Sequence, residues 1–147
     1  MAEKIDLNTL PKGLTKEEFT ALPNFKKIRS FFTWAGVVSI GSGILICSEI
    51  GKTAESVFQA GGSYDDMSRL WAVKLNMLFM IFDIVMGILL LKKKTTKMAY
   101  ILAITELVYI VLVLVLGGTI GIGAIAFLLA LAGAIRIDKK WKQYQEI

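Results

Sequence analysis

Two carboxylic acids lie inside apolar stretches of the chain, Asp83 in the run IFDIVMG and Glu106 in the run AITELVY. Acids in such surroundings are candidates for proton transfer or cation binding, because a charged side chain at membrane depth costs at least about 2.5–3.5 kcal/mol. The sequence has no histidine, so it lacks the imidazole of His-ligated metal sites and of Ser-His or Cys-His pairs. The single cysteine, Cys47, lies in an apolar run and is expected to stay inert. We expect no cofactor, no metal site and no enzymatic activity.

Four apolar stretches hold these residues, and each is about as long as a helix needs to cross a bilayer. They are residues 31–50, 72–91, 98–116 and 119–135. The chain has 147 residues, of which 55% are hydrophobic and 20% charged, and a mean hydropathy of +0.62. These values exclude an ordinary soluble domain. We predict an all-α integral membrane protein with four transmembrane helices in an antiparallel bundle.

The predicted organisation is one membrane domain with short flanking segments. Residues 1–30 form an N-terminal cytoplasmic or interfacial segment, residues 31–136 the transmembrane domain with an outer loop at 51–71, and residues 137–147 a basic cytoplasmic tail. Little of the chain is left for a soluble catalytic domain.

Basic residues fall on alternate connections and predict the orientation. Lysines and arginines precede the first stretch, lie between the second and third, and follow the fourth. The positive-inside rule places these three segments, and so both termini, in the cytoplasm, most simply at a bacterial cytoplasmic membrane. Orientation and contact with anionic lipid head groups account for the net charge of +5 without a nucleic-acid partner. We assign head-group contact to Lys92, Lys93 and Lys94, with phosphate binding as the alternative.

Asp83 and Glu106 are predicted to lie at the same depth. Each is eight residues from the cytoplasmic end of its stretch, or about 12 Å along a helix. A short turn joins these two stretches, so the helices should be antiparallel neighbours and the two carboxyl groups could meet. Asn76, Ser39 and Tyr109 are the polar side chains that we expect to support the pair.

Within the sequence, no basic residue is predicted at the depth of this acidic pair. Three arrangements would neutralise it: protonation with hydrogen bonds that set helix register, a lysine or arginine from a partner's helix, or a bound proton or cation on a transport path. Nearer the outer surface, Lys74 is expected to form an ion pair with Glu49.

Small residues repeat at four-residue spacing in the first and last stretches and predict close helix packing. Whether these faces meet within one chain or between copies is open from sequence alone, and we favour packing within the chain. The predicted packing positions are Ala35, Ser39, Gly43, Ala126, Ala130 and Ala134, with Cys47 continuing the first series.

Two helix starts are predicted outside the apolar stretches. Thr15 with Glu18 forms a capping-box pattern that begins a short amphipathic helix, which Pro23 ends; this helix would lie on lipid head groups or on a partner. Ser63 with Asp66 forms a second such pattern, and we expect the helix of the second stretch to begin there. Residues 53–60 are expected to be helical up to the break at Gly61 and Gly62, as a connector or a contact surface.

Two functions fit these features. The first is an accessory or partner-binding subunit of a larger membrane complex, in which Asp83 and Glu106 take part in helix association. The second is a proton- or cation-coupled transporter or channel for small solutes that uses the same acids and works as an oligomer. A third interpretation is an enzyme that acts on lipids or quinones, but the sequence contains no evident nucleophile for such a reaction. The expected partners are lipids and either another membrane protein or further copies of this chain.

Overall fold

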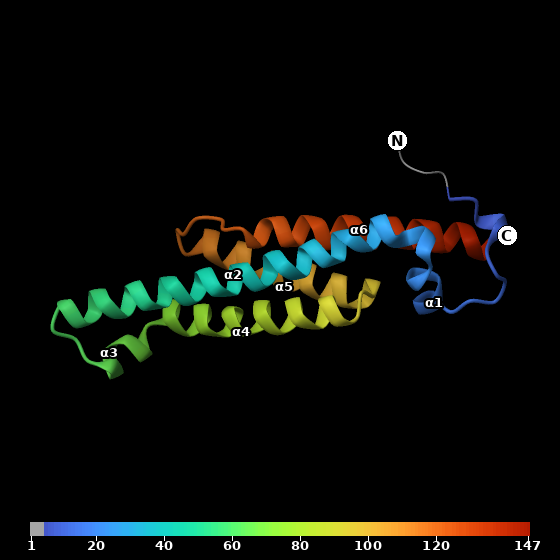
Figure 1. Ribbon diagram of the computed structural model, residues 1–147. Coiled ribbons are helices and arrows are strands. Elements are labelled where there is room, and N and C mark those ends of the chain that lie inside the picture. Colours follow the sequence, from blue (N-terminus) through green and yellow to red (C-terminus); the bar gives the residue numbers. More distant parts are fainter. Residues whose placement is uncertain (1–4) are drawn as a thin grey trace.

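The computed structural model describes residues 5–147, and every regular element in this range is a helix. The chain forms four long helices and several short ones (Figure 1). The long helices are α2 (Lys26–Gln59), α4 (Trp71–Lys92), α5 (Thr96–Val115) and α6 (Gly123–Gln145). The short α-helices are α1 (Lys16–Ala21) and α3 (Tyr64–Arg69), and two 3₁₀ turns cover Leu7–Thr9 and Pro23–Phe25.

Three of the long helices are long and apolar enough to cross a membrane: α2 with the preceding 3₁₀ turn, α4 and α5. The chain is therefore compatible with an integral membrane protein. The fourth predicted stretch, residues 119–135, is not helical throughout, because α6 begins only at Gly123. Its apolar part ends before Arg136 and spans about 20 Å at 1.5 Å per residue. The segment predicted as a basic tail, residues 137–147, continues α6 as far as Gln145.

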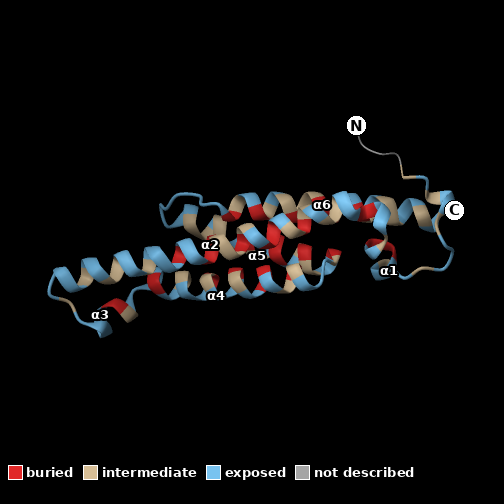
Figure 2. Cartoon of the chain, viewed as in Figure 1, coloured by how far each residue is buried: buried red, intermediate tan, exposed pale blue. Residues whose placement is uncertain are grey.

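The long helices lie side by side, with α2 packed along α4 and α6, and α5 packed mainly on α6 (Figure 1). The end that carries α1 and the last turns of α6 is called the α1 end here, and the opposite end, with α3, is called the α3 end. Buried residues concentrate where the four helices overlap, whereas the last turns of α2 and most of α3 are exposed (Figure 2).

Glycines let α2 and α4 approach closely. A Cβ placed on Gly87 would lie 2.7 Å from the backbone oxygen of Gly36, and one on Gly43 would lie 3.0 Å from the backbone oxygen of Met80. Direct backbone contact of this kind is how helices gain packing energy in lipid. The six predicted packing positions are all buried within the chain, whereas Cys47, which continued the series, is exposed.

The segment between α2 and α4 differs from the predicted loop. α2 continues without a break to Gln59. The chain then turns at Gly61, whose φ of +82° favours glycine. Ser63 and Asp66 form the predicted capping box, but the helix that they begin, α3, ends at Arg69. Leu70 is extended, with φ −69° and ψ 124°, and α4 starts after it as a separate helix. The expectation of one continuous helix from Ser63 is therefore wrong.

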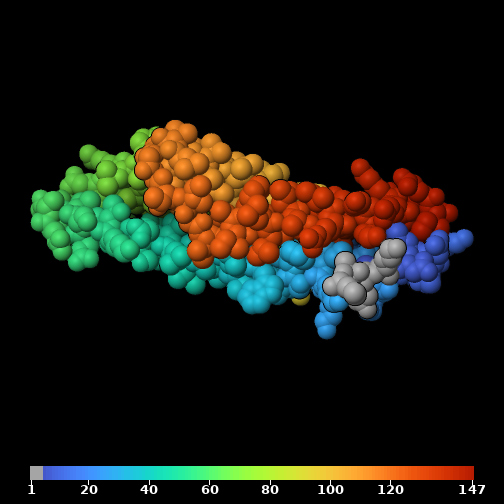
Figure 3. Space-filling model, turned by 90° about the horizontal axis from the view of Figure 1, so that it is seen from above, coloured from blue at the N-terminus to red at the C-terminus, as the bar shows by residue number. Residues whose placement is uncertain are grey.

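The N-terminal helix α1 packs on the end of α6 within the same chain. Thr15 and Glu18 form the predicted capping box. Phe19 is fully buried, with its ring centroid 5.2 Å from that of Trp141 and 5.1 Å from that of Tyr144 on α6. In the space-filling view the N-terminal segments (blue) lie against the end of α6 (red) (Figure 3). Trp141 and Tyr144 thus form an intramolecular aromatic contact with α1.

Candidate functional site

The two intramembrane acids lie in the interior of the helix assembly. Asp83 on α4 and Glu106 on α5 are each only 1% exposed. Helical periodicity places the small residues Gly87 and Ala103 on the same inward faces, and both are buried. The two carboxyl groups are close enough to interact electrostatically. The predicted common depth of Asp83 and Glu106 therefore brings them together, although α4 packs mainly on α2 and not on α5.

Ser39 on α2 links the two acid-bearing helices. Its hydroxyl donates a hydrogen bond of 2.9 Å to the backbone carbonyl of Asp83 and lies 3.5 Å from Oε1 of Glu106. A hydroxyl has one proton, so it can serve only one of these acceptors at a time. A protonated Glu106 would instead donate to the Ser39 oxygen and satisfy both contacts at once.

Three carboxyl oxygens in this cluster have no hydrogen-bond partner among residues 5–147: both oxygens of Asp83 and Oε2 of Glu106. The Ser42 hydroxyl lies close to Asp83 without the alignment of a hydrogen bond. In the same range, neither acid takes part in an ion pair with a lysine or arginine. Buried polar atoms are normally satisfied, so these oxygens call for a proton, water or another ligand.

The first residue of α6 faces Glu106. A Cβ on Gly123 would collide with Oε2 of Glu106 and would lie 3.2 Å from Oγ of Ser42. Only a glycine lets the start of this helix approach the carboxyl group so closely. The positive end of the α6 dipole lies near this point and would stabilise negative charge on Glu106. The α6 start therefore offsets part of the cost of an ionised acid.

A surface cavity of about 270 Å³ lies beside the acidic cluster, and neither acid lines it. Its rim includes the exposed residues Glu49 and Thr119, and its buried floor includes Ser42 and Gly123, the same two residues that touch the acids. Tyr109 lines the wall. The non-helical residues 119–122 form another part of the wall.

The remaining predicted site residues divide into two groups. Tyr109 donates a hydrogen bond of 3.1 Å to Oδ1 of Asn76, so these two side chains support each other and not the carboxyl groups. The predicted ion pair between Glu49 and Lys74 does not form. Glu49 pairs with Lys52 one turn along the same helix, at 2.7 Å, and the Lys74 ammonium lies 5.8 Å from the centroid of the Trp71 ring. A partner on the same helix needs no tertiary alignment and so competes well.

Lys92, Lys93 and Lys94 are exposed at the α4–α5 turn, where head groups would be accessible.

Three further residues of interest were not predicted from the sequence. Ser42 lies one helical turn beyond Ser39, and this spacing could have indicated it. Gly123 is the last glycine of the run GGTIGIG, and nothing in this run indicates contact with an acid. Asp138, a lone acid among basic residues, accepts a hydrogen bond of 2.7 Å from Tyr100 and pairs with Lys16 at 2.6 Å.

Comparisons with protein-family models, with curated proteins and with solved structures find no match to this chain. The function must therefore be argued from the site alone.

Proposed function

We propose that the protein crosses the membrane four times, with both termini in the cytoplasm. On this proposal α6 is the fourth span, completed on the outer side by the non-helical residues 117–122. The basic residues of the α4–α5 turn and of the last turns of α6 support this orientation by the positive-inside rule. The α1 end is then cytoplasmic and the α3 end faces outward.

We infer that Asp83 and Glu106 form a proton- or cation-binding site that couples to movement of a small solute. The observation that carries this proposal is a pair of buried carboxyl groups that have no ionic partner among residues 5–147 and that Ser42 and Gly123 separate from a surface cavity. Intramembrane acids that face a cavity are typical of proton and ion pathways. Within residues 5–147 no three potential metal ligands cluster, which favours a proton or a singly charged cation over a transition metal.

The site is closed on its cytoplasmic side. Between the acids and the α1 end the helices bury a tight apolar cluster that includes Phe32, Met86, Leu90 and Leu102. The arrangement therefore fits a state in which protons would reach the buried acids from the outer side, past Ser42 and Gly123. Passage to the cytoplasm would require this cluster to separate, and a homo-oligomer in which one copy braces another is the assembly that we propose.

Burial of the acids also bears on the alternative of a partner-supplied base. A lysine or arginine from a neighbouring helix would have to pass between packed helices to reach carboxyl groups that are 1% exposed. The geometry thus favours proton or cation binding over a pairing of these acids with a partner.

Proton binding is testable before any solute is known. Infrared difference spectra of the purified protein should contain the C=O stretching band of a protonated carboxylic acid, and this band should disappear as the pH is raised. Glu106→Gln or Asp83→Asn should remove it, whereas Glu49→Gln, at the rim, should keep it. A protein without a pH-dependent band that these substitutions remove would contradict the proposal. Solutes can then be screened in weak buffer for proton release that Glu106→Gln abolishes.

One observation favours a second candidate, an accessory subunit. At the α3 end, the last turns of α2 and the short helix α3 project beyond the turn between α5 and α6 (Figure 1). Exposed aromatic side chains lie on this projection and at the start of α4. Phe58, Tyr64 and Trp71 are 50%, 67% and 81% exposed. Native mass spectrometry from mild detergent should then show a stoichiometric second protein that is lost on Phe58→Ser with Trp71→Ser. Its loss on Asp83→Asn with Glu106→Gln instead would place the contact at the acids.

A further inference from the structure

A basic groove lies at the α1 end, far from the acidic cluster. Its volume is about 590 Å³, and nine residues of the N-terminal segment, the start of α2 and the last turns of α6 line it. Four of the nine are basic and none is acidic: Lys27, Arg136, Lys139 and Lys140. This groove is separate from the α4–α5 turn, to which the sequence assigned lipid contact.

The floor of the groove is apolar. Ile5, Ile28 and Phe31 contribute hydrocarbon surface between the basic side chains. Phe31 and Arg136 also mark the points where the apolar parts of α2 and α6 begin and end. The groove therefore lies at the proposed cytoplasmic boundary, with charge toward the water and hydrocarbon toward the membrane.

Arg136 is positioned to bind an anion. Its guanidinium carbon lies 4.6 Å from the centroid of the Phe31 ring. Stacking on an aromatic ring fixes the plane of the guanidinium and leaves the N–H groups at its edge available. No hydrogen bond or ion pair to another residue of the described range uses these N–H groups. A planar fork of this kind matches two oxygens of a phosphate group.

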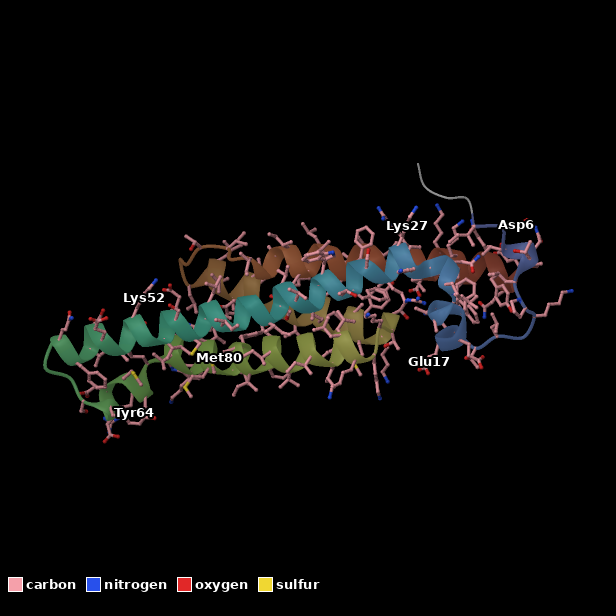
Figure 4. All side chains as sticks on the ribbon, viewed as in Figure 1. Asp6, Glu17, Lys27, Lys52, Tyr64 and Met80 are labelled. Carbon is pink, nitrogen blue, oxygen red and sulfur yellow. The ribbon has the colours of Figure 1, made fainter. Side chains whose placement is uncertain are left out.

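Other charged groups around the groove do not cancel its positive character. Arg29 on α2 is already engaged, because it donates to the carbonyl oxygens of Thr20 and Leu22 at 2.7 and 2.9 Å. Asp6, which is labelled with Lys27 in Figure 4, lines two neighbouring hollows and not the groove itself. The groove therefore keeps three basic side chains, those of Arg136, Lys139 and Lys140, against a single neighbouring carboxylate, that of Asp6.

We propose that this groove binds the head group of an anionic phospholipid of the cytoplasmic leaflet. The phosphate would lie on Arg136 with Lys139 and Lys140, and an acyl chain would follow Ile28 and Phe31. A lipid fits better than a soluble phosphate compound because the apolar floor continues into the membrane-facing surface. The site is independent of the acidic cluster, but it rests on the proposed topology, which places the α1 end in the cytoplasm.

The test uses the full chain and phosphatidylglycerol as the probe, with phosphatidylcholine for comparison. Native mass spectrometry and a thermal-shift assay in detergent would follow lipid binding to three proteins. The first is the wild type, the second carries Arg136→Gln, Lys139→Gln and Lys140→Gln, and the third carries Lys92→Gln, Lys93→Gln and Lys94→Gln. The last two lose the same charge from the same side of the membrane.

We expect the groove variant to bind phosphatidylglycerol on the order of 100-fold more weakly, because each of its three basic residues contributes about fivefold. The variant of the α4–α5 turn should lose less than about threefold. Arg136→Lys keeps the charge but loses the planar fork, so it should bind with intermediate affinity. This single substitution also provides the test if the triple variant does not fold.

Three results would overturn the proposal. Equal loss in both triple variants would mean that charge acts diffusely and that no site exists. Equal binding of phosphatidylcholine would show that the anionic head group is not recognised. Displacement of the lipid by inorganic phosphate at similar concentration would assign the groove to a soluble phosphate ligand.

Discussion

The hydroxyl oxygen of Ser39 lies 3.5 Å from Oε1 of Glu106, deep between α2 and α5. The same hydroxyl donates to the Asp83 carbonyl on α4, so a single side chain joins three helices at the level of the acidic cluster. This hydroxyl ties the packing of the helices to the protonation of the acids. A change in proton occupancy at Glu106 is therefore expected to alter how α2 and α5 meet.

Ser39→Ala should destabilise the protein by about 1–2 kcal/mol, because it removes an interhelical hydrogen bond and leaves the Asp83 carbonyl without it. Thermal or denaturant unfolding in detergent would measure this change. Ser48→Ala, at an exposed position of the same helix, is the matched control and should have no effect. Equal stability of the two variants would contradict the role given to Ser39.

Gly87→Ala should separate α2 from α4. The added methyl group would lie 2.7 Å from the Gly36 carbonyl oxygen, which is backbone and has no rotamer that relieves the clash. We expect a loss of about 1–3 kcal/mol, as in other overpacked interiors. Gly51→Ala is the control: its Cβ meets nothing within 4 Å, so the higher helix propensity of alanine should leave stability unchanged or raise it. The unfolding curve of Gly87→Ala should shift to lower stability. The curve of Gly51→Ala should stay in place or shift to higher stability.

Gly123→Ala should disturb the acidic cluster without removing an ionisable group. The new methyl group would occupy the place of Oε2 of Glu106, so the carboxyl group must move. The infrared band of the protonated acid should shift in frequency or change its midpoint pH. Gly121→Ala, two residues earlier and with no atom within 4 Å of its Cβ, should reproduce the wild-type spectrum. An unchanged band in Gly123→Ala would show that this glycine does not touch the acid.

The α3 cap should depend on pH. The Asp66 carboxylate accepts hydrogen bonds from the backbone N–H and then the hydroxyl of Ser63, at 2.7 and 2.9 Å, and these lower its pKa below the usual value of 3.8. Because the pKa of Asp66 is lower in the folded state, its carboxylate stabilises the cap at pH values above the usual pKa of 3.8. This contribution is lost as the pH falls through the pKa of the folded state.

Hydrogen-exchange protection of the α3 amides, corrected for intrinsic rates, would measure this dependence. Protection should decrease as the pH falls below about 4. Asp66→Asn should show weak protection already at neutral pH, whereas Asp65→Asn, outside the capping box, should behave as the wild type. Protection that is independent of pH in the wild type would rule out the cap as its source.

Phe19→Ala should release α1 from α6. The Phe19 ring is fully buried and its centroid lies 4.4 Å from that of Phe25 as well as near the two aromatic rings of α6. Removing a buried phenyl ring costs about 3–5 kcal/mol, and here the cost should fall on α1 and not on the long helices. Limited proteolysis should then cut near residues 12–27, whereas Glu17→Ala on the exposed face should leave the wild-type pattern.

The helical architecture was largely predictable because membrane-length apolar stretches and capping boxes are local signals. α4 and α5 agree with the predicted stretches to within two residues at each end. The helical turns predicted at residues 53–60 are confirmed, but they continue α2 and do not form a separate segment. The predicted boundary was wrong at residues 137–145, where polar residues continue α6. Hydropathy marks where lipid contact ends and carries no information on where the hydrogen-bonded helix ends.

The sequence by itself determined the helical class, the apolar stretches and the presence of two acids at equal depth, because each follows from residue type and spacing along one helix. The tertiary structure alone decided what these acids meet. Ser42 of α2 lies close to Asp83, and Gly123 of α6 lies close to Glu106. Glu49 forms its ion pair with Lys52 and not with Lys74. Such contacts depend on how the helices are rotated and how far they slide, and small differences in side-chain packing between distant segments set both.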